Sequence, residues 1–327
     1  MCGRAMDAPW AARYGSWRQS GVTGWALRGD EFDRPYRGVL RPAGISVDSD
    51  VRISDAVALA GPRDVITGWA AARMHGAAYV DGLSPSLEPI PVTVLSRHGA
   101  QHRPRGDLHP TRRSLHDHEI TDVDGISVTT LARATYDMCL DARSDVEALI
   151  AVDMCTSRVA GGARTTLDNV AAVVRSHVKT RGIARARRAV GLGSDRSGSP
   201  WETRTRWAAR RAGLKGLLVN EPVFDLTGRF LAVVDLIDPQ VGLVVESDGS
   251  GHRLEDVHAD DNVREEILEH VGLVVARVTA RDHRDPTALG RRLVSAHAMA
   301  RSSPRPQAWT VEPPHWWAGS TSGRRWA

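Results

Sequence analysis

The order of apolar and polar positions predicts a mixture of helices and strands in the first half of the chain. Residues 66–76 are rich in alanine and end at Gly76, a suitable helix C-cap. Residues 119–129 hold two β-branched stretches around Asp124-Gly125, a dipeptide typical of a tight hairpin turn. Further helices are expected over residues 52–61, 130–140 and 144–157, and a strand over residues 91–95. This half is therefore predicted to be α+β.

The second half begins with a well-marked helix. Ser199 is a favourable N-cap, Pro200 suits the first helical position, and Glu202 places an acid in the first turn. This helix is expected to end at Ala212, before Gly213. Strands are predicted over residues 230–237, 241–247 and 273–279, and helices over residues 256–271 and 286–299. The order α-β-β-α-β-α predicts a compact α/β unit whose antiparallel hairpin feeds a mixed sheet.

The length of 327 residues suggests about two domains. The N-terminal segment, residues 1–33, contains scattered turn residues and is expected to be irregular. It is followed by an α+β region over 34–158, a basic helical connector over 159–195 and an α/β domain over 196–300. The tail, residues 301–327, is rich in proline, glycine and serine, and is expected to be disordered.

Cysteine usage and hydropathy narrow the class of protein. The three cysteines, Cys2, Cys139 and Cys155, are far apart, which argues against a disulfide framework and against a zinc site built on paired cysteines. No apolar run approaches the ~20 residues of a spanning helix, and the N-terminus lacks the apolar core of a signal peptide. We therefore expect a cytoplasmic protein with no membrane association.

Basic residues only slightly outnumber acidic ones, 43 against 39, but they are unevenly distributed. Only Lys179 and Lys215 are lysine, and this arginine bias most simply reflects GC-rich coding. No acid occurs between Asp168 and Asp195, where six cations fall: Arg175, Lys179, Arg181, Arg185, Arg187 and Arg188. Such a segment can neutralise DNA phosphates. The alternative is an ordinary solvated helix face.

Acids that interrupt apolar strands are the strongest chemical feature of the sequence. Asp235 lies within one predicted strand, and Glu246 and Asp248 end the next. A two-residue loop at Pro239-Gln240 would pair Asp235 with Val244 and place Glu246 on the same face, one diagonal step away, at roughly 7–8 Å. Two carboxylates so placed can share Mg²⁺ or Mn²⁺, which prefer hard oxygen ligands. The alternative is a pair of acids that cap strand ends and bind arginines.

Several motifs over about residues 196–290 follow one another in a recognisable order. They are Ser199-Pro200-Trp201-Glu202, the Asp235 strand, Glu246-Ser247-Asp248-Gly249-Ser250-Gly251-His252, Asp261-Asn262-Val263-Arg264, Gly272, and Val275-Ala276-Arg277-Val278-Thr279. This segment resembles the Vsr-like branch (very-short-patch-repair endonuclease-like) of the PD-(D/E)XK nuclease superfamily. The resemblance implies a restriction-endonuclease-like α/β fold with a metal-dependent nuclease site.

The resemblance also implies roles for single residues. Asp235 and Glu246 match the metal ligands, and Glu202 matches the helical acid that supports them. His252 matches the histidine near the attacking water or the scissile phosphate, with Asp261 in support. Two further residues, Arg264 and Arg277, are expected to contact phosphate.

Asp248 departs from the pattern, because the superfamily usually has lysine there. The chain has no lysine after Lys215 that could replace it. The site is therefore either a nuclease assisted by His252 or a degenerate one kept for folding or DNA binding.

The first half has a resemblance of its own, over about residues 34–158. It is carried by Val65-Ile66-Thr67-Gly68-Trp69-Ala70-Ala71-Ala72-Arg73-Met74-His75-Gly76, by Pro91-Val92-Thr93-Val94, and by Gly125-Ile126-Ser127-Val128-Thr129-Thr130-Leu131-Ala132-Arg133-Ala134. This region is similar to AbiEi-type antitoxins, which implies DNA-linked regulation or phage defence and a cognate toxin as partner. Such proteins begin with a winged helix, of which residues 1–33 would be a degenerate form.

Three functional hypotheses follow. The first is a Mg²⁺- or Mn²⁺-dependent DNA endonuclease or nickase. The second is a non-catalytic DNA-binding regulator of the antitoxin kind that uses Arg185, Arg187 and Arg188 against phosphates. The third is a protein–protein module whose nuclease-like domain only acts as a scaffold. Scattered histidines, His98, His102, His109, His116 and His118, are interpreted as solvated loop residues.

Overall fold

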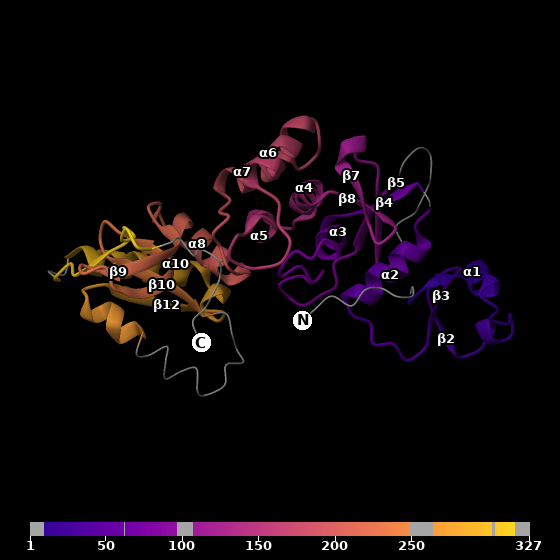
Figure 1. Ribbon diagram of the computed structural model, residues 1–327, viewed down its shortest axis with the longest axis horizontal. Coiled ribbons are helices and arrows are strands. Elements are labelled where there is room, and N and C mark those ends of the chain that lie inside the picture. Colours follow the sequence, from indigo (N-terminus) through magenta and orange to yellow (C-terminus); the bar gives the residue numbers. More distant parts are fainter. Residues whose placement is uncertain (1–9, 62, 97–106, 249–263, 303–304, 318–327) are drawn as a thin grey trace. The chain divides into compact units, whose positions relative to one another are not determined.

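The computed structural model describes residues 10–61, 63–96, 107–248, 264–302 and 305–317. The chain divides into two compact units (Figure 1). The first combines residues 1–142 with 168–187, and the second combines residues 143–167 with 188–327. Helices and three sheets, with parallel and antiparallel pairing, make up the described part, so the predicted α/β class is confirmed. None of the described helices has the length and apolar character needed to cross a bilayer.

The first unit opens with a small antiparallel sheet of order β1-β3-β2. Its strands are β1 (Ala12–Arg13), β2 (Phe32–Tyr36) and β3 (Val39–Pro42), and the short helix α1 (Tyr14–Gln19) and a 3-10 turn (Ala26–Arg28) lie between β1 and β2. Helix α2 (Ser49–Leu59) follows, and the Asp48 side chain caps it by accepting from the backbone N–H groups of Asp50 and Val51.

A five-stranded sheet of order β6-β5-β4-β8-β7 forms the body of the first unit. The strands are β4 (Asp64–Thr67), β5 (Val92–Ser96), β6 (Leu108–Thr111), β7 (Ile120–Val123) and β8 (Ile126–Thr129). Its helices are α3 (Gly68–Met74) and α4 (Leu131–Asp141), followed later in the chain by α6 (Leu167–Ser176). The predicted β7–β8 hairpin is confirmed, since Asp124 and Gly125 both have positive φ, 51° and 78°, as a type I′ turn requires.

The second unit holds a mixed sheet of order β12-β11-β10-β9-β13, in which only the β11–β12 pair is parallel. Its strands are β9 (Leu218–Asp225), β10 (Phe230–Asp238), β11 (Leu243–Asp248), β12 (Val274–Thr279) and β13 (Trp309–Thr310). The main helices are α5 (Asp145–Thr156), α8 (Pro200–Arg211) and α10 (Pro286–Ser302), and residues 264–270 are also helical. Helix α7 (Ile183–Leu192) has residues in both units.

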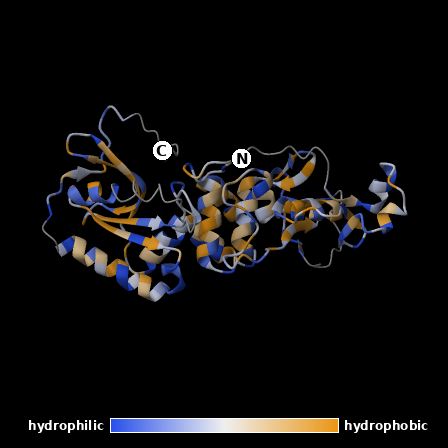
Figure 2. Cartoon of the chain, turned by 90° about the horizontal axis from the view of Figure 1, so that it is seen from below, coloured by the Kyte–Doolittle hydropathy of each residue, from blue (hydrophilic) through white to orange (hydrophobic). Residues whose placement is uncertain are grey.

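The second sheet has an apolar core on each side, and its strands are largely orange in Figure 2. On one side Leu236 and Val245 pack with residues of α8 and α10, including Ala209 and Leu293. The other core includes Val244, Ile237, Leu268, Leu273 and Trp309. Helix α8 begins as predicted, because Pro200 is its first residue and the Ser199 hydroxyl accepts from the Glu202 N–H at 3.3 Å.

The predicted strand order was wrong in one respect, since β9 precedes β10 and makes the order α-β-β-β-α-β-α. Residues 218–225 contain Asn220 and Pro222, which are rare in strands. Pro222 is tolerated because β9 pairs with β10 along its length, whereas β13 reaches only Phe224 and Asp225 on its other edge.

The expectation that the chain is disordered from residue 301 onward was also wrong over residues 305–317. Trp309 is buried in β13, and the Trp317 ring lies 5.0 Å from Phe224 and 5.3 Å from Phe230 between centroids. Composition favoured disorder because proline, glycine and serine are frequent there. Each buried tryptophan removes on the order of 200 Å² from water, which offsets the conformational entropy lost on ordering this segment.

Candidate functional site

Two of the predicted site acids lie where the paired segment of β10 and β11 ends. The register joins Leu236 to Val245, Ile237 to Val244 and Asp238 to Leu243, so Asp235 and Glu246 are the next residues along the two strands. The predicted two-residue loop was wrong, because the connection spans residues 239–242. The observed register differs from the predicted one by two residues, so it keeps the predicted side-chain alternation over residues 236–238 and 243–245.

Local hydrogen bonds explain the longer loop. The Asp238 carboxylate accepts from the backbone N–H of Gln240 at 3.0 Å, and the Asp238 carbonyl accepts from Gly242 N–H at 2.9 Å. Gly242 has φ of 74°, a left-handed conformation that glycine adopts without strain. An aspartate followed four residues later by glycine is the sequence feature that specifies this turn.

Glu202 is the third acid of the site and comes from the first turn of α8. Its side chain is buried, and its Oε2 atom accepts from Gly198 N–H and from the Asn220 amide, both at 2.6 Å. Burial and the neighbouring charge of Asp235 raise the pKa of Glu202 to about 7. The sequence analysis did not predict Asn220 as a site residue. Asn220 has φ of 49° in β9, and its one signal in the sequence is that an asparagine stands within a strand.

Glu246 experiences the same crowding of carboxylates. Burial, followed by the charge of Asp235, raises the pKa of Glu246 to about 8, although Arg264 opposes the shift and Glu202 adds to it. Asp235 itself accepts from Ser247 N–H at 2.7 Å, and the buried Ser247 hydroxyl has no hydrogen-bond partner among the described residues. The structure therefore brings Glu202, Asp235 and Glu246 within the range of mutual charge repulsion.

The two arginines predicted to contact phosphate interact with acids of the same unit. Arg264 donates to Glu246 Oε1 at 2.9 Å and to the carbonyl oxygen of Val233. Arg277 lies beside Glu246 in the parallel β11–β12 register, but its guanidinium pairs with Glu265 at 2.7 Å. Arg264 is thus bound to an acid of the three-carboxylate site, and the charge of Arg277 also acts on Glu246.

The other predicted site residues of this domain lie at the edge of the described chain or beyond it. Asp248 is the last residue of β11, is half-buried and pairs in register with Thr279. His252 and Asp261 fall within residues 249–263, outside the described part of the chain.

The arginines predicted to bind DNA in the basic segment differ in their surroundings. Arg185 donates to the carbonyl oxygen of Ala142 at 2.5 Å, and Arg188 pairs with Asp145 at 2.9 Å. Arg187 is exposed, as are four other cations of the segment: Arg175, Lys179, Arg181 and Arg188. The structure therefore gives Arg185 and Arg188 partners within the chain, and only Arg185 of these two is half-buried.

A buried polar cluster in the first unit was not predicted. Arg133 of α4 is fully buried and pairs with Glu119 at 2.6 Å and with Asp137 at 3.0 Å. His177 Nε2 lies 2.7 Å from Glu119 Oε1, and its Nδ1 lies 3.0 Å from the hydroxyl of Ser114. Burial would raise the pKa of Glu119, but His116 N–H, Arg133 and His177 outweigh it and hold that pKa below its usual value.

Part of this cluster has the composition of a metal site. Among the described residues, the ligand atoms of His116, Glu119 and His177 all lie within 4.8 Å of one another, a spacing that the three acids of the second unit do not match. His116, interpreted as a solvated loop residue, is exposed; its backbone N–H donates to Glu119 Oε2 at 2.9 Å, and its carbonyl oxygen accepts from the Glu119 N–H at 3.0 Å. Arg133 lies 3.2 Å from His177 Nε2 and pairs with Glu119, so a cation of the chain already lies within the cluster.

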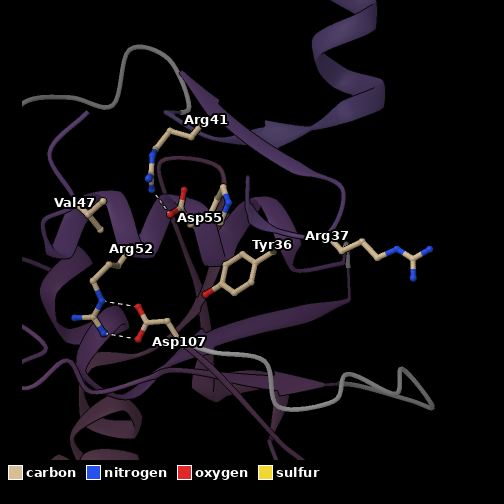
Figure 3. Close-up of a pocket in the computed structure, with 8 residues that line it drawn as sticks. Tyr36, Arg37, Arg41, Val47, Arg52, Asp55 and Asp107 are labelled. Atoms are coloured by element: carbon tan, nitrogen blue, oxygen red, sulfur yellow. Dashed lines mark hydrogen bonds and ion pairs between the residues drawn. The ribbon is translucent and has the colours of Figure 1, made fainter. Parts of the chain in front are cut away.

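A pocket of about 490 Å³, whose lining includes two arginine–aspartate pairs, lies elsewhere in the first unit (Figure 3). Arg52 donates two hydrogen bonds to Asp107, at 2.5 and 2.7 Å, and Arg41 pairs with Asp55. Burial raises the pKa of Asp55 to about 6, which Arg41 opposes. Figure 3 shows Arg37 pointing away from these pairs. The four charged side chains that pair with each other largely neutralise this pocket.

Comparison of the chain with protein-family models, with curated proteins and with solved structures gave no match.

Proposed function

We propose that the second unit is a divalent-cation-dependent DNA endonuclease or nickase. The observation that carries this proposal is the convergence of Glu202, Asp235 and Glu246 from α8, β10 and β11, with two of the three acids holding raised pKa values. Carboxylates are rarely crowded into a half-buried place without a compensating cation. The order α-β-β-β-α-β around a mixed sheet also agrees with the restriction-endonuclease-like fold that the sequence motifs imply.

The residues present suit a hard divalent cation. Asp235 and Glu246 are the next residues beyond the paired segment of β10 and β11, and the charge of Asp235 acts on Glu246, so one ion between them would offset both charges. Their all-oxygen donor set favours Mg²⁺ or Mn²⁺. Such an ion, when bound, supplies an activated water and screens the scissile phosphate. Glu202, held by Gly198 and Asn220, keeps a third acid beside Asp235.

Asp235→Asn tests this function directly. The variant keeps the size of the side chain but removes the charge, so nicking of supercoiled DNA with Mn²⁺ should fall on the order of 100-fold. Calorimetric titration should show that Mn²⁺ affinity falls with it. Glu312→Gln, which alters an exposed carboxylate, is the matched control and should match wild type. Equal cleavage by wild type and Asp235→Asn would contradict the proposal.

A DNA-binding regulator of the antitoxin kind is the second candidate, and the exposed cations of the basic segment favour it. DNA and a cognate toxin would be its partners, in the cytoplasm. Replacing Lys179, Arg181 and Arg187 together by glutamine should weaken DNA binding by roughly 10-fold near 0.1 M salt and flatten its salt dependence. Arg185→Gln is the control, because the half-buried Arg185 side chain donates to the carbonyl oxygen of Ala142 within the chain.

Fluorescence anisotropy over a series of salt concentrations measures the DNA affinity of the variants and of the control. The regulator hypothesis requires binding that needs no metal and that survives Asp235→Asn. Affinity that is unchanged in the triple variant would rule out this segment as the phosphate contact.

A further inference from the structure

The ion pairs of the pocket in Figure 3 contain more acids than arginines. Arg41 pairs with both Asp55 and Asp33. Arg52 pairs with Asp107. These five side chains sum to one negative charge when all of them are ionised. A further cation that entered the pocket would therefore be attracted to the acids.

Asp55 is the acid of this group whose hydrogen bonds are incomplete. Its side chain is 6% exposed, and its Oδ1 atom has no hydrogen-bond partner among the described residues. A buried carboxylate oxygen without a donor costs free energy. Arg37 also lines the pocket, but Figure 3 shows that its side chain points away from Asp55. A ligand that carries N–H groups would supply the missing donor.

Tyr36 places a hydroxyl and an aromatic ring beside these acids. Figure 3 shows its hydroxyl directed toward Asp107. Burial, followed by the charges of Asp107 and Asp55, raises the pKa of Tyr36 above its usual value, and the opposing charge of Arg52 is weaker. The acids that disfavour a phenolate at this place favour a cation there. The face of the ring adds cation–π attraction.

We propose that this pocket binds a small aliphatic amine, whose ammonium group lies beside Tyr36 and between Asp55 and Asp107. An ammonium has three N–H donors, so it can bind Asp55 and a second acceptor together. Val47 and Pro35 offer apolar contacts to the hydrocarbon part of the ligand. The volume of about 490 Å³ falls within the range of small-molecule sites, roughly 300–1,000 Å³. This inference does not depend on the proposed nuclease function of the second unit.

Titration of the full chain with n-butylamine at pH 7.5, followed by protein NMR, tests the inference. The pKa of Asp55 is raised to about 6, so this carboxylate is ionised at that pH. Butylamine should bind with a Kd of about 1 mM or lower, and 1-butanol, which lacks the charge, about 10-fold more weakly or worse. Butyrate tests the opposite ligand charge, because Arg41 Nε also has no partner among the described residues. Binding of 1-butanol or butyrate as tight as that of butylamine would overturn the proposal.

A lysine side chain of another protein would present the same ammonium group. Nα-acetyl-lysine methylamide mimics such a side chain, and it should bind no more tightly than butylamine. An affinity about 10-fold above that of butylamine would identify a protein lysine as the ligand and overturn the small amine.

Two substitutions locate the binding in this pocket. Val47→Arg adds a cation at a side chain that is 58% exposed, so it leaves the ion pairs in place and should weaken butylamine binding about 10-fold or more. Val47→Gln is the matched uncharged control and should stay within about threefold of wild type. Asp55→Asn should also weaken binding about 10-fold or more, with Asp168→Asn, at an exposed acid of the same unit, as its control.

Melting temperature shows whether each variant folds. If Asp55→Asn does not fold, Val47→Arg decides the question alone. Butylamine affinity within about threefold of wild type in either folded variant would overturn the assignment of the amine to this pocket.

Discussion

Replacing Arg133 by methionine is expected to lower the unfolding free energy of the first unit by about 3–5 kcal/mol. Arg133 is fully buried and binds Glu119 and Asp137, whose side chains are 1% and 0% exposed. The methionine fills a similar volume but removes the cation that two buried carboxylates share, which leaves Asp137 with Arg113 and Glu119 with His177. Chemical denaturation followed by fluorescence or circular dichroism measures the loss.

The matched control is Arg187→Met, which removes an exposed arginine from the same unit and should change stability by less than about 0.5 kcal/mol. A second variant isolates the cause. Combining Arg133→Met with Glu119→Gln removes one of the stranded charges and should recover part of the loss. A cost below about 1 kcal/mol for Arg133→Met would show that the ion pairs of this cluster do not stabilise the unit.

The second unit should lose about 2–4 kcal/mol of stability between pH 5 and pH 8 in metal-free buffer. The pKa of Glu202 is raised from 4.5 to about 7 and that of Glu246 from 4.5 to about 8. Both acids therefore hold their protons more tightly in the folded chain than in the unfolded one. In this window the folded state binds more protons, so the unfolding free energy falls as the pH rises. Thermal melts across the pH range measure it.

Substitution of either acid should reduce this dependence of the unfolding free energy on pH. Glu202→Gln and Glu246→Gln eliminate the titrating groups, so each variant should be more stable than wild type at pH 8 and close to it at pH 5. Millimolar Mn²⁺ should stabilise wild type more at pH 8 than at pH 6, because the ion binds the ionised acids. Glu312→Gln should reproduce the wild-type profile. A stability that rises with pH between 5 and 8 would contradict this account of the site.

Local interactions are the part of the fold that the sequence predicted well. The Ser199-Pro200 start of α8 and the Asp124-Gly125 turn depend on residues within a few positions of one another. The antiparallel pairing of β10 with β11 was predicted too, although its register was wrong by two residues.

Long-range partners could not be predicted in the same way. β13 is two residues long and forms because Trp309 fits against the edge of β9, which no local pattern indicates. The place of Asn220 beside Glu202 and that of Glu119 and His177 around Arg133 depend on packing between segments 14 to 58 residues apart. The roles of Asp235, Glu246 and the arginines remain predictions that the experiments above test.

The interleaved order of the two units has a consequence for how the protein is made and can be divided. The first unit needs His177, which the ribosome adds only after it has made α5 of the second unit. A fragment ending at residue 158 would leave Glu119 without its histidine. A fragment starting at residue 196 would lose Asp153, to which Thr203 and Arg206 donate at 2.7 and 2.5 Å. Neither unit is formed by one continuous stretch of residues, so transfer of either half to another protein would remove residues that the remaining unit needs.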